Sequence, residues 1–288
     1  MKHSLRVLAS RRGLRVLSLN ALAAFGLLSG VVQLITAVWD FKNGVWYPGW
    51  IVAGIILASL AWGLSRALPS RRLQRDFQLP DMTVSVVVGD LFDQDAHLIV
   101  GFSDTFDTDI TDNVVISAKS VLGQMLQRVY GGDRERLDAE LVGALTEEKV
   151  ESVEPEEAKR GGKRSRYAIG TVVVLGSPAK RIFGVAYTKM GNDLIARSSV
   201  DNLWRSLNQV WDAVYLHGQR ERVAIPLVGA EFARISCLDR DSLLKMILLS
   251  FVARAREDPV CHELTVVIHP RDYEKINLLE VKAFLQAI

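Results

Sequence analysis

The sequence predicts a two-helix transmembrane hairpin followed by an α/β domain built as a three-layer α/β/α sandwich on a mixed sheet. Two long stretches near the N-terminus contain no charged residue. After residue 80, short β-branched runs alternate with amphipathic stretches, a pattern typical of α/β domains. A length of 288 residues accommodates both parts.

The charge-free stretches run over residues 16–39 and 45–65. Each is long enough to cross a hydrocarbon core of about 30 Å. A cleaved signal peptide is disfavoured because a second span follows. A soluble helical hairpin is the other alternative, and stretches this long without charge are rare in soluble cores.

The charges at the ends of the hairpin predict its orientation. Residues 1–15 form a basic N-terminus, and a basic linker follows at 66–80, whereas the connection between the spans has one Lys and one Asp. The positive-inside rule then places both termini in the cytoplasm. We expect the linker to contact anionic membrane lipid, and the Gly26-x-x-x-Gly30 spacing to permit close approach of helices from different copies.

Charge and residue types exclude several function classes. Residues 1–80 carry ten Lys and Arg against two Asp, whereas the remainder has 25 basic and 31 acidic residues. An acidic domain of this kind is a poor partner for nucleic acid. Cys237 and Cys261 lack metal-ligand spacing, and the histidines are scattered, so we expect neither a metal nor a catalytic triad.

We place the second domain at residues 81–288, with a charged insertion at about 133–166. The insertion is poor in aromatic residues, so we expect a short helix at 134–145 and then a solvated loop. The remaining patterns predict strands at 83–88, 97–102, 167–175, 181–187, 222–228 and 264–269, and helices at 116–130, 199–216, 238–256 and 271–288.

Two loops at strand ends are the candidate binding site, because open α/β sheets bind ligands there. Small residues in these loops let backbone N–H groups approach an anion, and Asp90 could accept from an adenine amino group. The alternative for each residue is a turn role within its own backbone. The candidate ligand-binding residues are Asp90, Leu91, Gly101, Phe102, Ser103, Asp104, Thr105, Asp107, Val228, Gly229, Ala230, Glu231, Phe232, Ala233 and Arg234.

Several segments of the domain resemble those of a known family. The stretches VVVGDLFDQDAHLIVGFSD and YAIGTVVVLGSPAKRIFGVAYTKM resemble the opening strands and the β-hairpin of the macro domains. VAIPLVGAEFARISCLDRDSLLKMILLSF resembles their phosphate-loop strand and the following helix, and LTVVIHPRDYEKI their last strand and helix. The resemblance covers roughly residues 82–280 apart from the insertion.

The resemblance implies binding of ADP-ribose or a relative. Asp90 and Leu91 match the family's adenine contacts, residues 101–107 its distal-ribose loop, and residues 229–234 its pyrophosphate loop. The Asn-Ala-Ala-Asn pattern of many ADP-ribosyl hydrolases is replaced by Gly101-Phe102-Ser103-Asp104, and the glycine triplet is absent. We therefore assign no catalytic residue and expect a sensor rather than an enzyme.

A macro domain behind a two-span hairpin resembles the inner-membrane effector of type II Thoeris anti-phage systems. The resemblance implies a TIR-domain partner that makes an ADP-ribose-derived signal, such as histidine-ADP-ribose. Binding of that signal would trigger homo-oligomerisation and membrane disruption.

Two other functions remain open from the sequence. One is a membrane-tethered hydrolase of ADP-ribosyl esters or phosphoesters, in which Asp104, Asp107 or Glu231 activates water. The other is a scaffold that binds no ligand and recruits a partner. Asp104 and Asp107 could also attract a cationic amino-acid group on the ligand.

Overall fold

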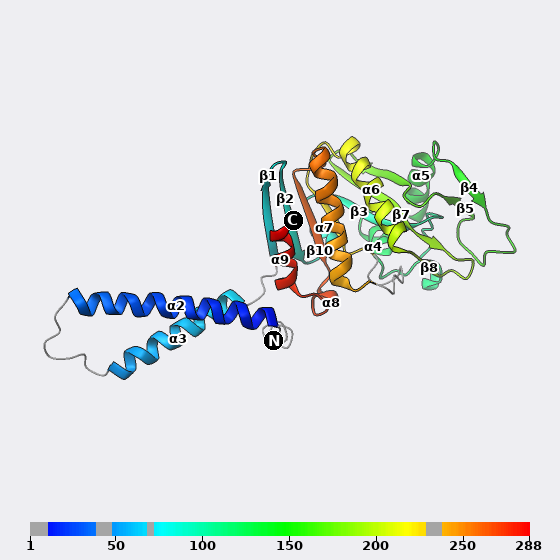
Figure 1. Ribbon diagram of the computed structural model, residues 1–288. Helices are drawn as coiled ribbons and strands as arrows, with labels where there is room; N and C mark the ends of the chain where they lie inside the picture. The colour runs from blue at the N-terminus through cyan, green and yellow to red at the C-terminus, as the bar shows by residue number, and fades with distance from the viewer. Residues whose placement is uncertain (1–10, 39–47, 68–71, 229–237) are drawn as a thin grey trace. The chain divides into compact units, whose positions relative to one another are not determined.

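The computed structural model describes residues 11–38, 48–67, 72–228 and 238–288 (Figure 1). It separates into two compact units. One comprises residues 1–71 with 277–283, and the other comprises residues 72–276 with 284–288.

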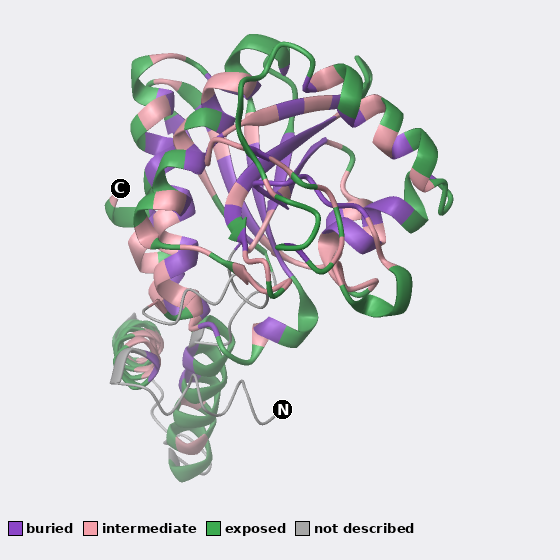
Figure 2. Cartoon of the chain, turned by 90° about the vertical axis from the view of Figure 1, so that its right-hand side faces the viewer, coloured by how far each residue is buried: buried purple, intermediate pink, exposed green. Residues whose placement is uncertain are grey.

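The first unit contains the helical hairpin, made of α2 (Arg11–Val38) and α3 (Pro48–Ala67). By length and composition, Gly13–Ala37 and Gly49–Arg66 are long and apolar enough to cross a membrane. Most of their large apolar side chains are exposed (Figure 2). The two helices expected from the charge-free stretches are therefore present, and each could span a membrane.

The two helices pack against each other at Gly63 of α3. A Cβ atom at Gly63 would lie 2.9 Å from the backbone oxygen of Leu17 and 3.0 Å from the Cβ atom of Ala21 on α2. A Cβ atom at Gly26 or Gly30 would have nothing within 4 Å. The Gly26–Gly30 spacing is therefore not used inside the hairpin.

The second unit is a mixed sheet with helices on its faces, as the sequence predicts. The strands are β1 (Arg72–Gln78), β2 (Asp81–Val88), β3 (His97–Ser103), β6 (Val172–Ser177), β7 (Lys180–Met190), β8 (Ala196–Arg197), β9 (Val223–Pro226) and β10 (Glu263–Ile268). The order in the sheet is β1-β2-β10-β9-β3-β7-β6, and β8 pairs with β7. The five strands from β2 to β7 run parallel, whereas β1 and β6 pair antiparallel at the two edges.

The helices of this unit are α4 (Val121–Arg128), α5 (Arg134–Ala144), α6 (Val200–His217), α7 (Arg240–Glu257) and α8 (Pro270–Tyr273), with 3-10 turns at Leu91–Asp93 and Thr111–Asn113. The last helix, α9 (Leu278–Ala287), is divided between the two units after residue 283. Side chains alternate between the faces of a strand. On β3, Leu98, Val100 and Phe102 pack in one buried cluster with α4 and α5. The other face lies under α6 and α7, where the indole N–H of Trp211 donates to the Ser250 hydroxyl at 3.0 Å.

Residues 72–78 form the edge strand β1, although the sequence predicted a linker over residues 66–80. Residues 72–78 pair with β2 along their whole length, from Arg72 opposite Val87 to Gln78 opposite Asp81. Leu73 and Phe77 are buried, and polar side chains alternate with them. Charged side chains are common on edge strands because they discourage pairing with other chains. Three of the charges that suggested a linker, those of Arg72, Arg75 and Asp76, therefore belong to a strand.

The charged insertion is also more ordered than the solvated loop expected after residue 145. The helix at 134–145 is confirmed as α5, and residues 147–166 then contain β4 (Val150–Val153), which pairs antiparallel with β5 (Ser165–Tyr167). Two cationic side chains of this segment, Lys159 and Arg166, are buried. A buried cation requires a partner inside the protein, and both partners lie beside the candidate site.

Replacement of Gly63 by Leu is expected to push α2 and α3 apart by about 2 Å, because axis separation follows the size of the side chains at the contact. Distances between spin labels at the exposed positions 22 and 57 in detergent would report the change. Gly54→Leu is the control, because a Cβ atom at Gly54 meets nothing within 4 Å. Equal distances in both variants would contradict the packing described.

Candidate ligand-binding site

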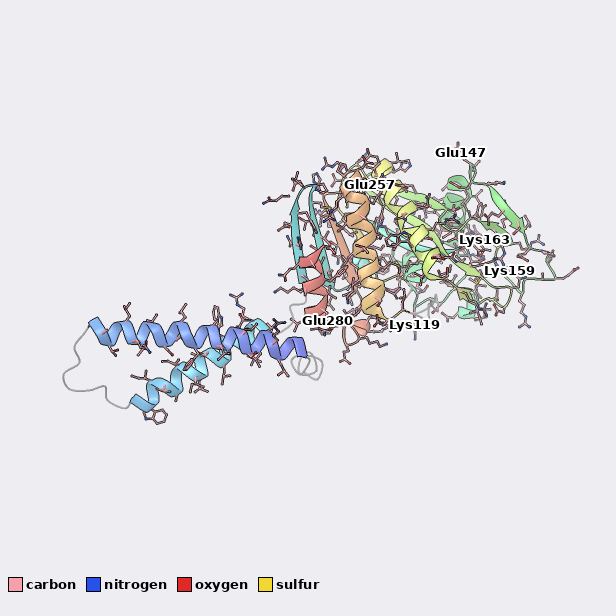
Figure 3. The ribbon with its side chains drawn as sticks, in the orientation of Figure 1. Lys119, Glu147, Lys159, Lys163, Glu257 and Glu280 are labelled. Atoms are coloured by element: carbon pink, nitrogen blue, oxygen red, sulfur yellow. The ribbon has the colours of Figure 1, made fainter. Side chains whose placement is uncertain are left out.

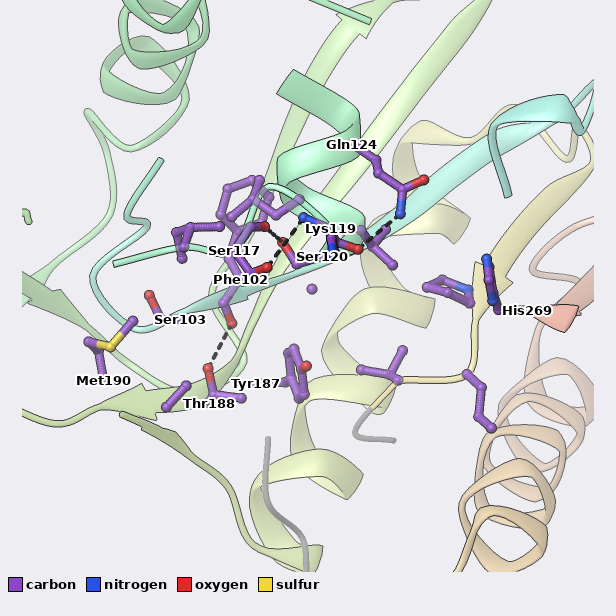
Figure 4. A pocket seen from close by; sticks show the side chains of 18 of the residues that line it. Phe102, Ser103, Ser117, Lys119, Ser120, Gln124, Tyr187, Thr188, Met190 and His269 are labelled. Atoms are coloured by element: carbon purple, nitrogen blue, oxygen red, sulfur yellow. Dashed lines mark hydrogen bonds between the residues drawn. The ribbon is translucent and has the colours of Figure 1, made fainter. Parts of the chain in front are cut away.

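A cavity of about 500 Å³ lies where the parallel strands end. The ends of β3, β7, β9 and β10 all contribute to it, through residues such as Ser103, Thr188, Leu227 and Val267. Ser103, Thr188 and Met190 lie on one side of the close view and His269 on the other (Figure 4). Carboxyl ends of adjacent parallel strands are the usual ligand site of open α/β sheets.

The loop of residues 115–120 and the start of α4 form another wall of the cavity. Ser120 caps α4: its hydroxyl accepts from the Gly123 N–H at 3.0 Å and donates to the Ser117 carbonyl at 2.6 Å. The Gln124 amide donates to the Lys119 carbonyl at 3.1 Å. These bonds fix the backbone of Lys119, whose side chain is exposed at the cavity.

The aromatic ring of Tyr187 packs directly on the backbone of Gly101. A Cβ atom at Gly101 would lie 2.3 Å from Cε1 of Tyr187, so a larger residue there would displace the ring. Both residues line the cavity. The glycine is thus explained by close approach of an aromatic side chain to a strand.

The rim of the cavity carries positive charge. Lys119 and Arg271 line it, and no ion pair to either is found within the described ranges. The acidic lining residue Asp272 is already paired with Arg240 of α7. The field at this rim therefore favours an anionic ligand.

The loop that continues from β3, residues 104–108, is almost completely buried. Its Asp107 pairs with Lys159 of the insertion at 2.9 Å, with side chains 1% and 0% exposed. The Lys163 N–H also donates to Asp107, and the Lys159 ammonium donates to the Lys163 carbonyl. Lys159 and Lys163 lie close together in the insertion (Figure 3). The insertion therefore packs on the back of the cavity wall.

Asp104 makes the second connection to the insertion. Its carboxylate accepts from Arg166 at 2.7 Å and from the N–H of Met190, a lining residue, at 2.8 Å. Arg166 also donates to Glu154 at 2.6 Å and to Asn192 at 3.0 Å. Burial would lower the pKa of Arg166, but its hydrogen bonds to Glu154 and Asp104 outweigh burial and raise that pKa. The same guanidinium lowers the pKa of Glu154.

Phe106 completes this loop with a backbone φ of 48°, in the left-handed region that a bulky residue rarely adopts. Its side chain is fully buried between the rings of Phe102 at 5.3 Å and Tyr167 at 5.7 Å. Such backbone strain persists only where the surrounding contacts hold it.

The structure brings together only some of the expected site residues. Gly101, Phe102, Ser103 and Val228 line the cavity. Asp104, Thr105 and Asp107 lie behind its wall, whereas residues 229–234, expected as the pyrophosphate loop, lie outside the described residues.

Asp90 and Leu91, expected at adenine, are not among the residues that line the cavity. The Asp90 carboxylate accepts from the Phe92 N–H and pairs with Arg128 at 2.7 Å, and Leu91 is buried in the core cluster. Their contact with a ligand stays a prediction.

Sequence reasoning missed much of the cavity. The residues that it did not select include Ser117, Lys119, Tyr187, Met190, His269 and Arg271. Ser120 could have been recognised as a helix cap, since Ser before an apolar run is a cap signal. No local pattern identifies Tyr187, because only the pairing of β3 with β7 places its ring on Gly101.

Comparison with known proteins settles the family. The family model described as Thoeris protein ThsA, Macro domain, matches residues 84–269. The chain belongs to the ThsA macro-domain family. The expected macro domain is thereby confirmed, and the cavity lies within the matched part except for Arg271 and Asp272.

Solved structures similar to this ThsA-family chain include macrodomains of Oceanobacillus iheyensis. The macrodomain with ADP has 13% identity, covers 76% of this chain and 100% of its own, and has a TM-score of 0.42. A mutant of that macrodomain with ADPR has 14% identity, covers 75% and 99%, and has a TM-score of 0.46. A search of curated proteins finds no match.

Replacement of Arg166 by Met is expected to lower the free energy of unfolding by about 3–5 kcal/mol, because it leaves the buried Asp104 without its cation. Urea unfolding of the full chain in detergent, followed by tryptophan fluorescence, would measure this. Arg164→Met is the matched control: Arg164 pairs with Glu156 at 3.3 Å, but the two side chains are 47% and 88% exposed. Its effect should stay within about 0.5 kcal/mol, and an equal loss in both variants would contradict the prediction.

Proposed function

We propose that this protein is a membrane effector of a bacterial Thoeris anti-phage system, whose macro domain binds an ADP-ribose-derived signal. A TIR-domain partner makes the signal, such as histidine-ADP-ribose, and binding triggers homo-oligomerisation and disruption of the inner membrane. The family match supports the macro-domain part of this proposal. The observation that carries ligand binding is the cavity at the ends of the parallel strands, where the rim cations have no ionic partner among the described residues.

The lining of the cavity suits the parts of such a ligand. Lys119 and Arg271 suit a diphosphate, because neither has an ionic partner within the described ranges. Tyr187, Met190 and Ile195 supply apolar and aromatic surface, and Ser103, Ser117 and Thr188 supply hydroxyl groups. Cavities of this size with few polar groups are typical of small-molecule sites.

A sensor fits the site better than a hydrolase. Two of the three acids that the hydrolase alternative names as bases, Asp104 and Asp107, are held by Arg166 and Lys159 and do not line the cavity. The third, Glu231, lies outside the described residues. A general base must reach the water that it activates, directly or through one water. The same pairing removes the reason to expect these two acids to attract a cationic group of the ligand.

The effector part of the proposal rests on the hairpin. Two helices that could span a membrane precede the macro domain in the chain. On the outer surface of α2, Gly26 and Gly30 remain unpacked, a small-residue spacing that permits close contact between helices of different copies.

Calorimetry of the full chain in detergent with ADP-ribose is expected to show binding, and Lys119→Gln should weaken it about tenfold, because a hydrogen bond to a charged group is lost. Lys180→Gln is the control. Lys180 lies at the opposite end of β7 from the lining residue Met190.

Three outcomes of that experiment would count against the proposal. Absence of binding to ADP-ribose and to its amino-acid conjugates would remove the proposed function. Binding that is unaffected by Lys119→Gln would remove the assignment of the diphosphate to this rim. Steady release of a hydrolysis product would favour the hydrolase.

A further inference from the structure

A continuous chain of hydrogen bonds connects the cavity wall with the insertion. The hydroxyls of Ser103 and Thr105 lie 3.1 Å apart, and the Thr105 hydroxyl donates to Oδ2 of Asp107. The same Oδ2 atom accepts from the Lys159 ammonium at 2.9 Å. Ser103 lines the cavity, whereas Thr105, Asp107 and Lys159 are buried behind it.

The chemistry of these groups fixes the direction of each hydrogen bond. A carboxylate paired with an ammonium group accepts hydrogen bonds and donates none. Thr105 must therefore donate its only hydroxyl proton to Asp107, so its oxygen accepts from Ser103. The Ser103 hydroxyl therefore donates its hydrogen bond to Thr105, and toward the cavity it can only accept one.

We propose that Lys159 and Asp107, acting through Thr105, make Ser103 a hydrogen-bond acceptor that selects a hydroxyl-bearing ligand group over a phosphate at this position. A sugar hydroxyl can donate to Ser103, whereas a phosphate oxygen would meet a lone pair. Ser103 is the specificity-determining residue, and Thr105, Asp107 and Lys159 are positioning residues. The inference rests on the proposed function, because it deepens the recognition of the distal ribose of ADP-ribose.

The cost of breaking this arrangement explains why it holds. Reversal of the Ser103 hydroxyl would leave the buried Thr105 oxygen without its donor, and an unsatisfied buried polar atom costs about 1–3 kcal/mol. A network of buried polar groups is more stable when each of its groups has a hydrogen-bond partner. The acceptor character of Ser103 is therefore built into the apoprotein.

Three probes that share the adenosine diphosphate part test the inference: ADP, ADP-ribose and ATP. ADP-ribose places a ribose, and ATP a phosphate, beyond the diphosphate. For the full chain in detergent, Ser103→Ala is expected to lower the affinity for ADP-ribose roughly two- to tenfold, which is the effect of one hydrogen bond. The affinity for ADP should be unchanged. An equal loss for both probes would overturn the direct contact at Ser103.

Thr105→Val tests the polarity. It removes the acceptor of the Ser103 hydrogen bond, so that Ser103 can donate to a phosphate. The affinity for ATP should therefore rise roughly two- to tenfold relative to the affinity for ADP-ribose. Thr108→Val is the matched control: it lies in the same buried loop and loses a hydrogen bond to Asp138 at 2.7 Å, outside the chain. If Thr105 had only a structural role, both variants would change ligand affinity alike, and the ratio of ATP affinity to ADP-ribose affinity would stay at the wild-type value.

A double variant, Asp107→Asn with Lys159→Met, is designed to reverse the chain. The amide oxygen would stay on the Lys163 N–H, and the amide N–H₂ would donate to Thr105. Ser103 would then donate to the cavity, favouring ATP over ADP-ribose. If this variant does not fold, the ratio of ATP affinity to ADP-ribose affinity in Thr105→Val alone tests the inference.

The outcomes separate the two proposals. If wild-type protein binds neither ADP nor ADP-ribose, the proposed function fails. If both bind but Thr105→Val shows the wild-type ratio of ATP to ADP-ribose affinities, the polarity inference fails and the proposed function stands.

Discussion

The pairing of two insertion cations with two buried carboxylates is the constraint on which the cavity wall depends. Asp104 and Asp107 follow β3 directly, and each would be an uncompensated buried charge without Arg166 and Lys159. Removal of one partner from such a pair is strongly destabilising. The strained backbone at Phe106 lies between the two pairs. The wall formed by the end of β3 therefore has its conformation only when the insertion is folded against it.

The same pairing divides the charges of the site into two sets. The carboxylates of Asp104 and Asp107 lie behind the wall and are neutralised there, whereas the cations Lys119 and Arg271 remain at the rim. Because the carboxylates cannot reach a ligand, the wall offers hydroxyl groups, backbone and the ring of Tyr187 instead. Among the described residues, this surface suits the sugar and the diphosphate of the proposed ligand.

The hairpin shows a comparable division between contacts made inside one copy and surfaces left open. Close approach of α2 and α3 takes place at Gly63, whereas a Cβ atom at Gly26 or Gly30 would meet nothing within 4 Å among the described residues. Small residues at helix surfaces are a common means of association in membranes. Self-association of this surface stays a prediction, and it concerns a part of α2 that the internal packing does not use.

The sequence by itself determined the elements whose patterns are local: the two charge-free helices, the apolar strands β2 and β3, and the helix α6. It also determined the order of motifs that marks a macro domain. Tertiary structure alone decided that residues 72–78 join the sheet and that Lys159 meets Asp107, 52 residues away in the chain. The physical reason is that periodicity reports which face of an element is apolar, whereas the partner of a charge depends on chain packing.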